Sequence, residues 1–470
     1  MHWLRPVLLF CLLLGPLVLC GQDGPVPAPA GPYRVIGVVI SGNRVTKERV
    51  IHREMTLAEG DTVTADDLYK RLARSEQNLR NTSLFNTVLL LPVYITPEEV
   101  LIEVRVGERW YLWPAPILQL ADPNFNQFLR FMDLSRLNWG LYLNQFNFRG
   151  MNETVYLKLQ FGYTRQYALR YKVPYLDRRG RWSLSVGGSW SEQAEVTIAT
   201  VEGERIFHLP VDGNARIVKM ADAELGFRRR HDVRHAIRLA LVDAEVVDSV
   251  ALRAPDYFGA GATSSTFAGL GYTFIWDTRD SRFFAHRGHY LEVKVDRIGL
   301  GNRGGIDPDI TKLYAAVRRW WRTGERTTFA GSLSGKATIG PFTPYFVQEG
   351  LGYGNFVRGY EYYVVDGQDF ALGKANFLFQ LIKPREYYVE PVPMEAFRTL
   401  YVALYLNFFA DVGYVRDRQY AAANPLANSW LVGGGTGLNL VTSYDQVFRL
   451  EYSLNGLGEG GLFLHFTQPF

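Results

Sequence analysis

From about residue 110 to the C-terminus, apolar and polar side chains alternate in segments of roughly ten residues, separated by turn-forming residues. In NETVYLKLQFGY the apolar side chains from Val155 to Phe161 share one face, and Lys158 and Gln160 lie on the other. RGHYLEVKVDRIG, which ends at Gly299, shows the same pattern. A period of two predicts β-strands with one apolar face.

Long alternating strands fit either a soluble sandwich or a membrane barrel with lipid outside and water inside. Length decides between them, because about 360 residues of strand are too many for one sandwich of about 100 residues. At about 22 residues per strand and connection, the segment 109–470 predicts a transmembrane β-barrel of about 16 antiparallel strands. It contains no apolar run long enough for a membrane-spanning helix.

The preceding segment, 33–108, predicts a small α/β domain with the element order β-α-α-β-β. An apolar strand ends at Gly42-Asn43, and two helical patterns and two further strands follow. Thr64 is expected to cap the second helix, since Asp67 follows it by three residues. Leu68, Leu72 and Leu79 are spaced to bury one face of that helix.

The first 21 residues predict a secretory signal, with Arg5 before an apolar core from Val7 to Cys20. Residues 22–32 are a linker rich in Pro, Gly and Ala. Both cysteines, Cys11 and Cys20, belong to the signal, so no disulfide is expected in the exported chain. Lipidation of Cys20 stays open.

Composition supports an exported β-protein and excludes other classes. The chain has 27 Tyr, 29 Phe and 45 Gly, which favours strands. A net charge of +4 and dispersed Lys and Arg argue against nucleic-acid binding. No catalytic constellation, metal-ligand set or cofactor motif is present, so we predict no enzyme, no metal and no cofactor. The glycines from Gly433 indicate close backbone approach or a kink in a barrel wall, and the basic run from Arg228 to His231 predicts a solvated or headgroup-facing turn.

Several motifs follow one another in a fixed order. LRNTSLF ends the second helical pattern, and NFFADVGYV contains Asp411. The remaining motif residues are Asp277, Arg279, Asp280 and Gly288 in WDTRDSRFFAHRGHYL, Val357, Arg358, Gly359 and Tyr360 in FVRGYEYY, and Phe466 and Phe470 in the last alternating strand. As an ordered set over nearly the whole exported chain, these motifs resemble the outer-membrane assembly and translocation superfamily of the BamA and TamA type. In that superfamily a POTRA module precedes a 16-strand barrel.

The resemblance implies a role for each motif. The segment of about 341–368 would fold back into the barrel lumen and lay Arg358 against Asp411, and Gly359 would permit the tight turn. Gln380 stands where relatives often carry a glutamate that helps to hold the arginine. The turn after Asp277 would lie in the periplasm, and Phe466 and Phe470 would form a C-terminal sorting signal. The alternative for the loop is an extracellular lid with a solvated Arg358.

The resemblance also implies a location and a function. The chain would reside in the outer membrane of a Gram-negative bacterium, with the POTRA-like domain in the periplasm binding clients along a strand edge. The expected partners are outer-membrane lipid and unfolded outer-membrane proteins or secreted polypeptides, with periplasmic chaperones or accessory lipoproteins as further candidates. The barrel seam and lumen loop would carry insertion or translocation. A passive channel or structural barrel without a polypeptide client is the alternative.

Overall fold

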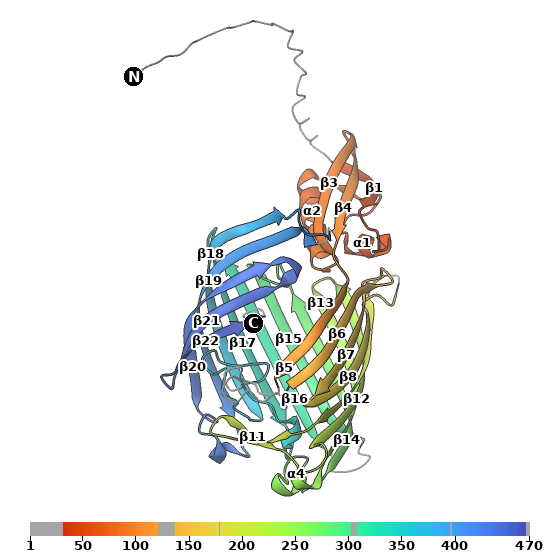
Figure 1. The fold of residues 1–470 in the computed structure, drawn as a ribbon. Helices are drawn as coiled ribbons and strands as arrows, with labels where there is room; N and C mark the ends of the chain where they lie inside the picture. The colour runs from red at the N-terminus through yellow and green to blue at the C-terminus, as the bar shows by residue number, and fades with distance from the viewer. Residues whose placement is uncertain (1–31, 121–136, 178, 302–307, 395–396, 467–470) are drawn as a thin grey trace, which may run out of the picture.

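The computed structural model describes residues 32–120, 137–177, 179–301, 308–394 and 397–466. The predicted signal segment and nearly all of the linker lie outside these residues. The described chain forms a small N-terminal module followed by a large barrel (Figure 1).

The N-terminal module consists of β1 (Tyr33–Ser41), α1 (Glu48–Glu54), β2 (Thr62–Val63), α2 (Ala65–Arg80), β3 (Phe85–Thr96) and β4 (Glu99–Glu108). Its sheet has the order β2-β1-β4-β3, and only β1 and β4 run parallel. The element order matches the prediction, with the two-residue β2 in addition. The hydroxyl oxygen of Thr64 accepts the Asp67 amide at 3.3 Å, as predicted for the helix cap. Leu68 and Leu79 are buried.

The described residues of the barrel form one antiparallel sheet of sixteen strands, in agreement with the strand count predicted from length. The strands are β5 (Leu112–Leu120), β6 (Leu137–Phe148), β7 (Glu153–Gly162), β8 (Thr164–Val173), β9 (Trp182–Gln193), β12 (Arg216–Arg230), β13 (Val233–Val246), β14 (Ser264–Asp277), β15 (Gly288–Leu300), β16 (Ile310–Arg322), β17 (Thr327–Ile339), β18 (Asp369–Tyr388), β19 (Thr399–Arg416), β20 (Trp430–Thr442), β21 (Val447–Asn455) and β22 (Gly460–His465). Neighbouring strands in this order pair with each other, and β5 and β22 are the first and last strands of the sheet.

The two faces of the barrel wall differ in polarity. On β21, Arg449 and Glu451 are buried inside, whereas Leu450 and Tyr452, which alternate with them, are 44% and 49% exposed on the outside. A strand in lipid shows this pattern when it encloses a polar interior. None of the helices in the described part of the chain is long and apolar enough to span a bilayer.

The two ends of the barrel are covered by different elements. The N-terminal module sits over one end, here called the module end (Figure 1). Covering the other end, the loop end, are the hairpin of β10 (Val196–Val201) and β11 (Glu204–His208), the helix α4 (Asp248–Arg253), and short turns η2 (Tyr345–Val347) and η4 (Ala421–Ala423). The segment 340–368 between β17 and β18, here called the lumen loop, contains η2. It packs against the hairpin of β10 and β11, where the Val364 amide donates to the carbonyl of Gly203 at 2.8 Å.

Candidate functional site

The tip of the lumen loop places Arg358 against the inner barrel wall, with no exposed surface. Its Nε and Nη2 donate to the two oxygens of Asp411 at 2.8 and 2.6 Å, and its backbone amide donates to the same carboxylate at 3.0 Å. Nη1 donates to Asn376 at 2.7 Å, and the guanidinium lies 3.9 Å from the ring centre of Phe409. A planar fork facing a carboxylate is the geometry that favours arginine over lysine.

Glycines on both sides make this close approach possible. Gly359 has a φ of +96°, a conformation that L side chains rarely adopt. In the facing wall, a Cβ on Gly433 would overlap the carbonyl oxygen of Arg358, and a Cβ on Gly413 would overlap Val357. The glycine run from Gly433 therefore serves backbone approach in a barrel wall, as its pattern predicted.

A second layer of charges surrounds the pair. Glu451 lies 3.6 Å from Nη1 of Arg358 and accepts a hydrogen bond from Arg449 at 2.9 Å. Lys374 lies 3.7 Å from Asp411. Removing two charges from water is costly unless partners and hydrogen bonds compensate. The sequence contained a signal for this layer, because Arg449 and Glu451 are two charged residues that alternate with the apolar outward face of the same strand.

The expectation for Gln380 is wrong. Its amide donates to Tyr405 at 3.1 Å instead of approaching Arg358. Gln380 faces the lumen, but it lies four residues beyond Asn376 on β18, roughly 13 Å further along at about 3.3 Å per residue. The partner of Arg358 on β18 is Asn376, and the second carboxylate near Arg358 is that of Glu451 on β21.

The loop tip also contacts the last strand of the barrel. His465 of β22 lies 3.6 Å from Glu361 of the loop and stacks on Phe356 at 5.7 Å between ring centres. Tyr360 is buried, and its hydroxyl accepts the amide of Gly456 at 3.2 Å. The lumen loop is therefore attached to β22 as well as to the wall.

The turn between β14 and β15 lies at the module end. Arg279 donates to both oxygens of Asp277 at 2.8 and 2.9 Å. Asp280 accepts the amide of His286 at 2.9 Å, and Gly288 has a φ of +107° in a place where a Cβ would crowd the turn backbone. The four predicted turn residues thus close one compact turn.

The predicted C-terminal signal is described only in part. Phe466 is 61% exposed and packs edge-on against Phe448 at 5.6 Å between ring centres. Phe470 lies outside the described residues.

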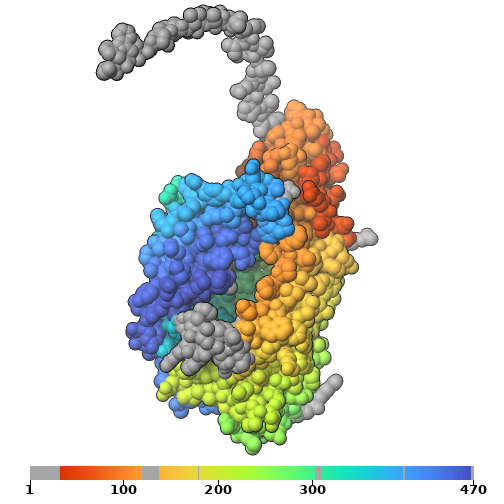
Figure 2. Space-filling view, viewed as in Figure 1, coloured from red at the N-terminus to blue at the C-terminus, as the bar shows by residue number. Residues whose placement is uncertain are grey.

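The two terminal strands of the barrel sheet leave a seam. β22 pairs with β21 and β5 pairs with β6, and no strand pairing joins β5 to β22 in the part of the chain that the structure describes. Figure 2 shows an opening between β5 and the C-terminal strands, through which the far wall is visible. The seam is an interruption in an otherwise continuous sheet.

Two prolines on β5 help to explain the seam. The carbonyl of Tyr111 accepts the amide of Phe146 on β6, so odd-numbered residues of this strand direct their backbone groups toward β6. Even-numbered residues then direct theirs toward the seam. Pro114 and Pro116 are both even-numbered, and proline has no N–H to donate. The seam edge of β5 therefore lacks two donors that a closed barrel would use.

Comparison with known proteins identifies the family. The sequence profile of the Omp85 superfamily domain matches residues 147–453, and the POTRA profile, described as a surface antigen variable number repeat, matches residues 33–109. The first match covers more than half of the chain. The chain belongs to the Omp85 superfamily.

Individual relatives agree with this assignment. A segment of 79 residues is 38% identical to the outer membrane protein assembly factor BamA of Neorickettsia risticii (strain Illinois), which is 16% of this chain and 10% of that relative's length. The fold is similar to a crystal structure of BamA from Haemophilus ducreyi lacking POTRA domains 1–3 (TM-score 0.52, 14% identity, 92% of this chain and 83% of that one). It is also similar to CdiB from Escherichia coli (TM-score 0.56, 13% identity, 93% and 75%).

The POTRA module of this Omp85 protein is fixed to the barrel by a buried acid. Glu54 at the end of α1 accepts a hydrogen bond from Tyr175 at 2.8 Å and lies 3.3 Å from Arg228 and 3.4 Å from His231. Burial alone would raise the pKa of Glu54, but the hydrogen bond from His231 and the charge of Arg228 lower this pKa to about 2. The expectation of a solvated turn is therefore wrong for Arg228 and His231, which face Glu54 of α1, whereas Arg229 and Arg230 of the same run are exposed.

Further contacts connect the POTRA module with other turns at the module end. The amide of Gln77 donates to the carbonyl of Asp280 at 2.9 Å, and the amide of Lys47 donates to the carbonyl of Gly150 at 2.9 Å. Arg109 forms an ion pair with Asp445, between β20 and β21. The POTRA module is thus held over the mouth of the barrel from several sides.

Proposed function

We propose that this protein works in the outer membrane of a Gram-negative bacterium, with its POTRA module in the periplasm, and inserts or translocates other polypeptides. The observation that carries the proposal is the seam between β5 and β22. Unpaired strand edges offer backbone donors and acceptors to an incoming strand. An extended client could pair there without unfolding the rest of the barrel.

The POTRA module supplies a second edge. β3 lies at the border of its sheet, whereas β4 lies between β1 and β3 and has no free side. Leu89 on β3 is 47% exposed. We infer that a client first adds to the β3 edge and then moves to the seam.

The lumen loop has a supporting role in this proposal. Arg358 fixes the loop tip to β19, and the contact between Glu361 and His465 connects the tip to β22. Through these contacts the loop holds the β22 side of the seam in place. Among the described residues, the loop makes no hydrogen bond or ion pair with β5. We infer that Val357, Arg358, Gly359 and Tyr360 set the position of the seam and do not contact a client directly.

Site-specific photo-crosslinking tests the proposal. A crosslinking residue at Leu118 of β5, 74% exposed, or Leu464 of β22, 58% exposed, should capture unfolded outer-membrane precursors or a secreted polypeptide. Leu333 on β17 is 65% exposed on the closed wall and is the matched control, which should capture none. Equal capture at all three positions would show that clients do not prefer the seam, and no capture together with conductance of small solutes would show a passive channel instead.

The prolines of β5 give an independent test. Replacing Pro114 and Pro116 together by Val returns two donors to the seam edge, so the edge can pair more fully with β22. We expect client capture at Leu464 to fall several-fold. Replacing Pro384 of β18 by Val is the control, since this proline lies in the closed wall away from both proposed edges, and it should leave capture at Leu464 unchanged. Undiminished capture in the seam variant would mean that the missing donors do not govern the seam.

A further inference from the structure

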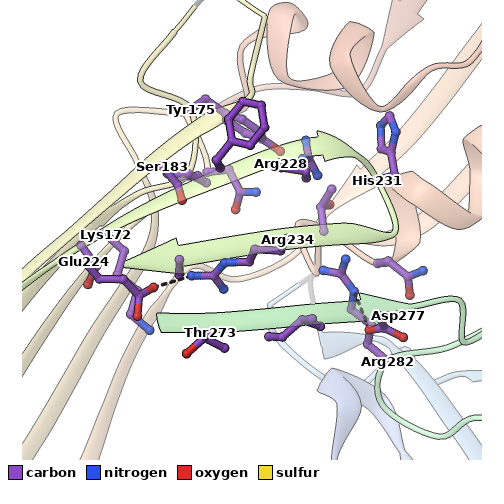
Figure 3. A pocket seen from close by; sticks show the side chains of 18 of the residues that line it. Lys172, Tyr175, Ser183, Glu224, Arg228, His231, Arg234, Thr273, Asp277 and Arg282 are labelled. Carbon is purple, nitrogen blue, oxygen red and sulfur yellow. Dashed lines mark hydrogen bonds and ion pairs between the residues drawn. The ribbon is translucent and has the colours of Figure 1, made fainter. Parts of the chain in front are cut away.

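A cavity of about 870 Å³ lies at the module end, between the POTRA helices and the inward faces of β8, β9 and β12 to β15. Figure 3 shows side chains directed into one space beneath the helices, among them Lys172 and Arg234 from these strands and Arg282 from the turn between β14 and β15. Its lining contains ten Lys and Arg residues against five Asp and Glu residues. That surplus is larger than the net charge of +4 for the whole chain, so positive charge is concentrated here.

The carboxylates in and beside the cavity are shared between cations. Arg170 donates to both oxygens of Asp222, and Arg238 lies 3.2 Å from the same carboxylate. Arg279 and Arg282 both pair with Asp277. Because one carboxylate carries one negative charge, the site at Asp222 leaves net positive charge facing the cavity.

Three further cations have no carboxylate among the described residues. Arg74 of α2 donates to the side-chain oxygen of Gln77 at 3.3 Å. Lys172 and Arg181 line the same cavity and make no side-chain hydrogen bond or ion pair with another described residue. A cavity lined by unmatched cations and low-dielectric walls concentrates anions.

The cavity faces the lumen and not the lipid. On β13, Arg234 and Arg238 line it, whereas Ile237 and Leu239 of the same strand are about half exposed on the outer surface. Lipid headgroups at the outer surface are separated from these arginines by the barrel wall. The POTRA helices border the cavity on one side and the inward faces of the barrel strands on the other.

We propose that this cavity binds a carboxylate-rich, extended segment of the polypeptide client as it passes from the POTRA module to the barrel, an inference that rests on the proposed function. Asp and Glu side chains of such a segment would accept hydrogen bonds from Arg74, Lys172 and Arg181 and complete the partnering of the shared arginines. The site selects clients by acidic charge and not by a single residue.

Binding to the purified full-length protein in detergent tests this proposal. The probe is a fluorescein-labelled peptide of alternating Glu and Ser, with the Gln and Ser counterpart as the neutral control, measured by anisotropy. The Glu peptide should bind and weaken as salt rises, and the Gln peptide should not bind. If both peptides bind equally, charge is not what the cavity recognises and the proposal is overturned.

Two triple variants localise the binding. Arg74→Gln with Lys172→Gln and Arg181→Gln should raise Kd about tenfold, since three charge-assisted contacts are lost together. The control removes three exposed cations outside the cavity, Arg44→Gln with Arg326→Gln and Lys383→Gln. It should change Kd by less than about twofold, because distant exposed charges are screened. An equal loss in both variants would show binding to diffuse surface charge and overturn the proposal.

Charge reversal gives a result that a folding defect cannot produce. The variant Arg74→Glu with Lys172→Glu and Arg181→Glu should lose the Glu peptide and gain binding of a Lys and Ser peptide. Failure of both peptides to bind a barrel that keeps its heat-resistant compact form would place recognition elsewhere.

Competition separates the peptide from other anions. Unlabelled Glu peptide should displace the probe, whereas inorganic phosphate at the same charge concentration and phosphatidylglycerol vesicles should not. Displacement by phosphate would assign a small-anion site, and displacement by phosphatidylglycerol but not phosphatidylcholine would assign a lipid headgroup site; either result overturns the proposal.

The experiment is independent of the seam. If the Glu peptide does not bind while Leu464 still captures clients, the cavity inference is wrong and the proposed function stands. If the peptide binds through the three cations but Leu118 and Leu464 capture nothing, the binding site stands and the proposed function is wrong.

Discussion

At the loop end of the lumen, each guanidinium nitrogen of Arg358 meets an oxygen of the wall, whereas at the module end Arg170 and Arg238 share the one carboxylate of Asp222. Around Arg358, the cations Lys374 and Arg449 face the carboxylates of Asp411 and Glu451, and the carboxylate of Glu361 accepts the backbone amide of Gly359 beside them. The module end has twice as many basic as acidic side chains. Arginine therefore holds the loop in place where carboxylates balance its charge. Where they do not, its positive charge can attract a ligand.

The backbone differs between these regions as well. At the loop end, Gly359, Gly413 and Gly433 bring two backbones into contact and exclude solvent from the ion pair. At the module end, turns and helices keep the walls apart, and the cavity remains between them. Where the two backbones are in contact, Arg358 has a structural role. Where the walls are apart, the arginines of the cavity can bind a ligand.

Asp411→Ala tests the matched end and should have the largest effect. It leaves the buried charge of Arg358 without its main partner, which costs about 3–5 kcal/mol. The compact barrel band on cold SDS gels should then convert at a clearly lower temperature than that of the wild type. Adding Arg358→Ala should restore part of the loss, because the buried guanidinium that lost its main partner is then absent. If Asp411→Ala keeps wild-type heat resistance, the pair does not hold the loop.

The pH dependence of the POTRA contact tests the module end. The pKa of Glu54 is about 2 in the folded protein against 4.5 ordinarily, so ionised Glu54 stabilises docking above pH 4.5. That stabilisation is lost as the pH falls from 4.5 toward 2 and amounts to on the order of 3 kcal/mol. The protection of the α1 amides from hydrogen exchange, expressed relative to the intrinsic exchange rate at each pH, should therefore fall over this range in the wild type. In Glu54→Gln the fall in protection should be much smaller, and an equal fall in both proteins would assign it to other carboxylates.

Gly433→Ala tests the role of close approach. The added methyl group overlaps the carbonyl oxygen of Arg358, and such overpacking costs about 1–3 kcal/mol. Gly331→Ala in β17 is the matched control, since its nearest neighbour would be 3.7 Å away. The temperature at which the compact band is lost should fall for Gly433→Ala alone. Equal behaviour of the two variants would mean that the loop tip can move away from the wall.

Sequence alternation predicted the barrel and the face of each strand, because a period of two follows directly from strand geometry. Alternation does not give the level of a residue along the barrel axis, because that depends on the stagger between strands. Gln380 was assigned to the correct face at the wrong level, and Glu451 was missed for the same reason.

The module-end cavity could not be predicted from local pattern. Arg74 lies on α2, while Lys172 and Arg181 flank a barrel turn about a hundred residues later. Only docking of the POTRA module brings them together. The basic run at Arg228 showed the charge but not the helix that Arg228 and His231 face.

Gln380→Ala should have the smallest effect. It tests whether a residue on the lumen face of β18, but further along the barrel axis than Asn376, contributes to the site of Arg358. The change removes one hydrogen bond, to the Tyr405 hydroxyl, which still lies 3.2 Å from His286. A loss below about 1 kcal/mol is therefore expected, with heat resistance close to that of the wild type. Glu451→Gln is the comparison variant: it removes a fully buried charge next to Arg358 and Arg449 and should lower heat resistance clearly. If Gln380→Ala instead destabilises the barrel as strongly as Asp411→Ala, Gln380 does help to hold Arg358, and matched partnering at the loop end extends further along β18 than the contacts indicate.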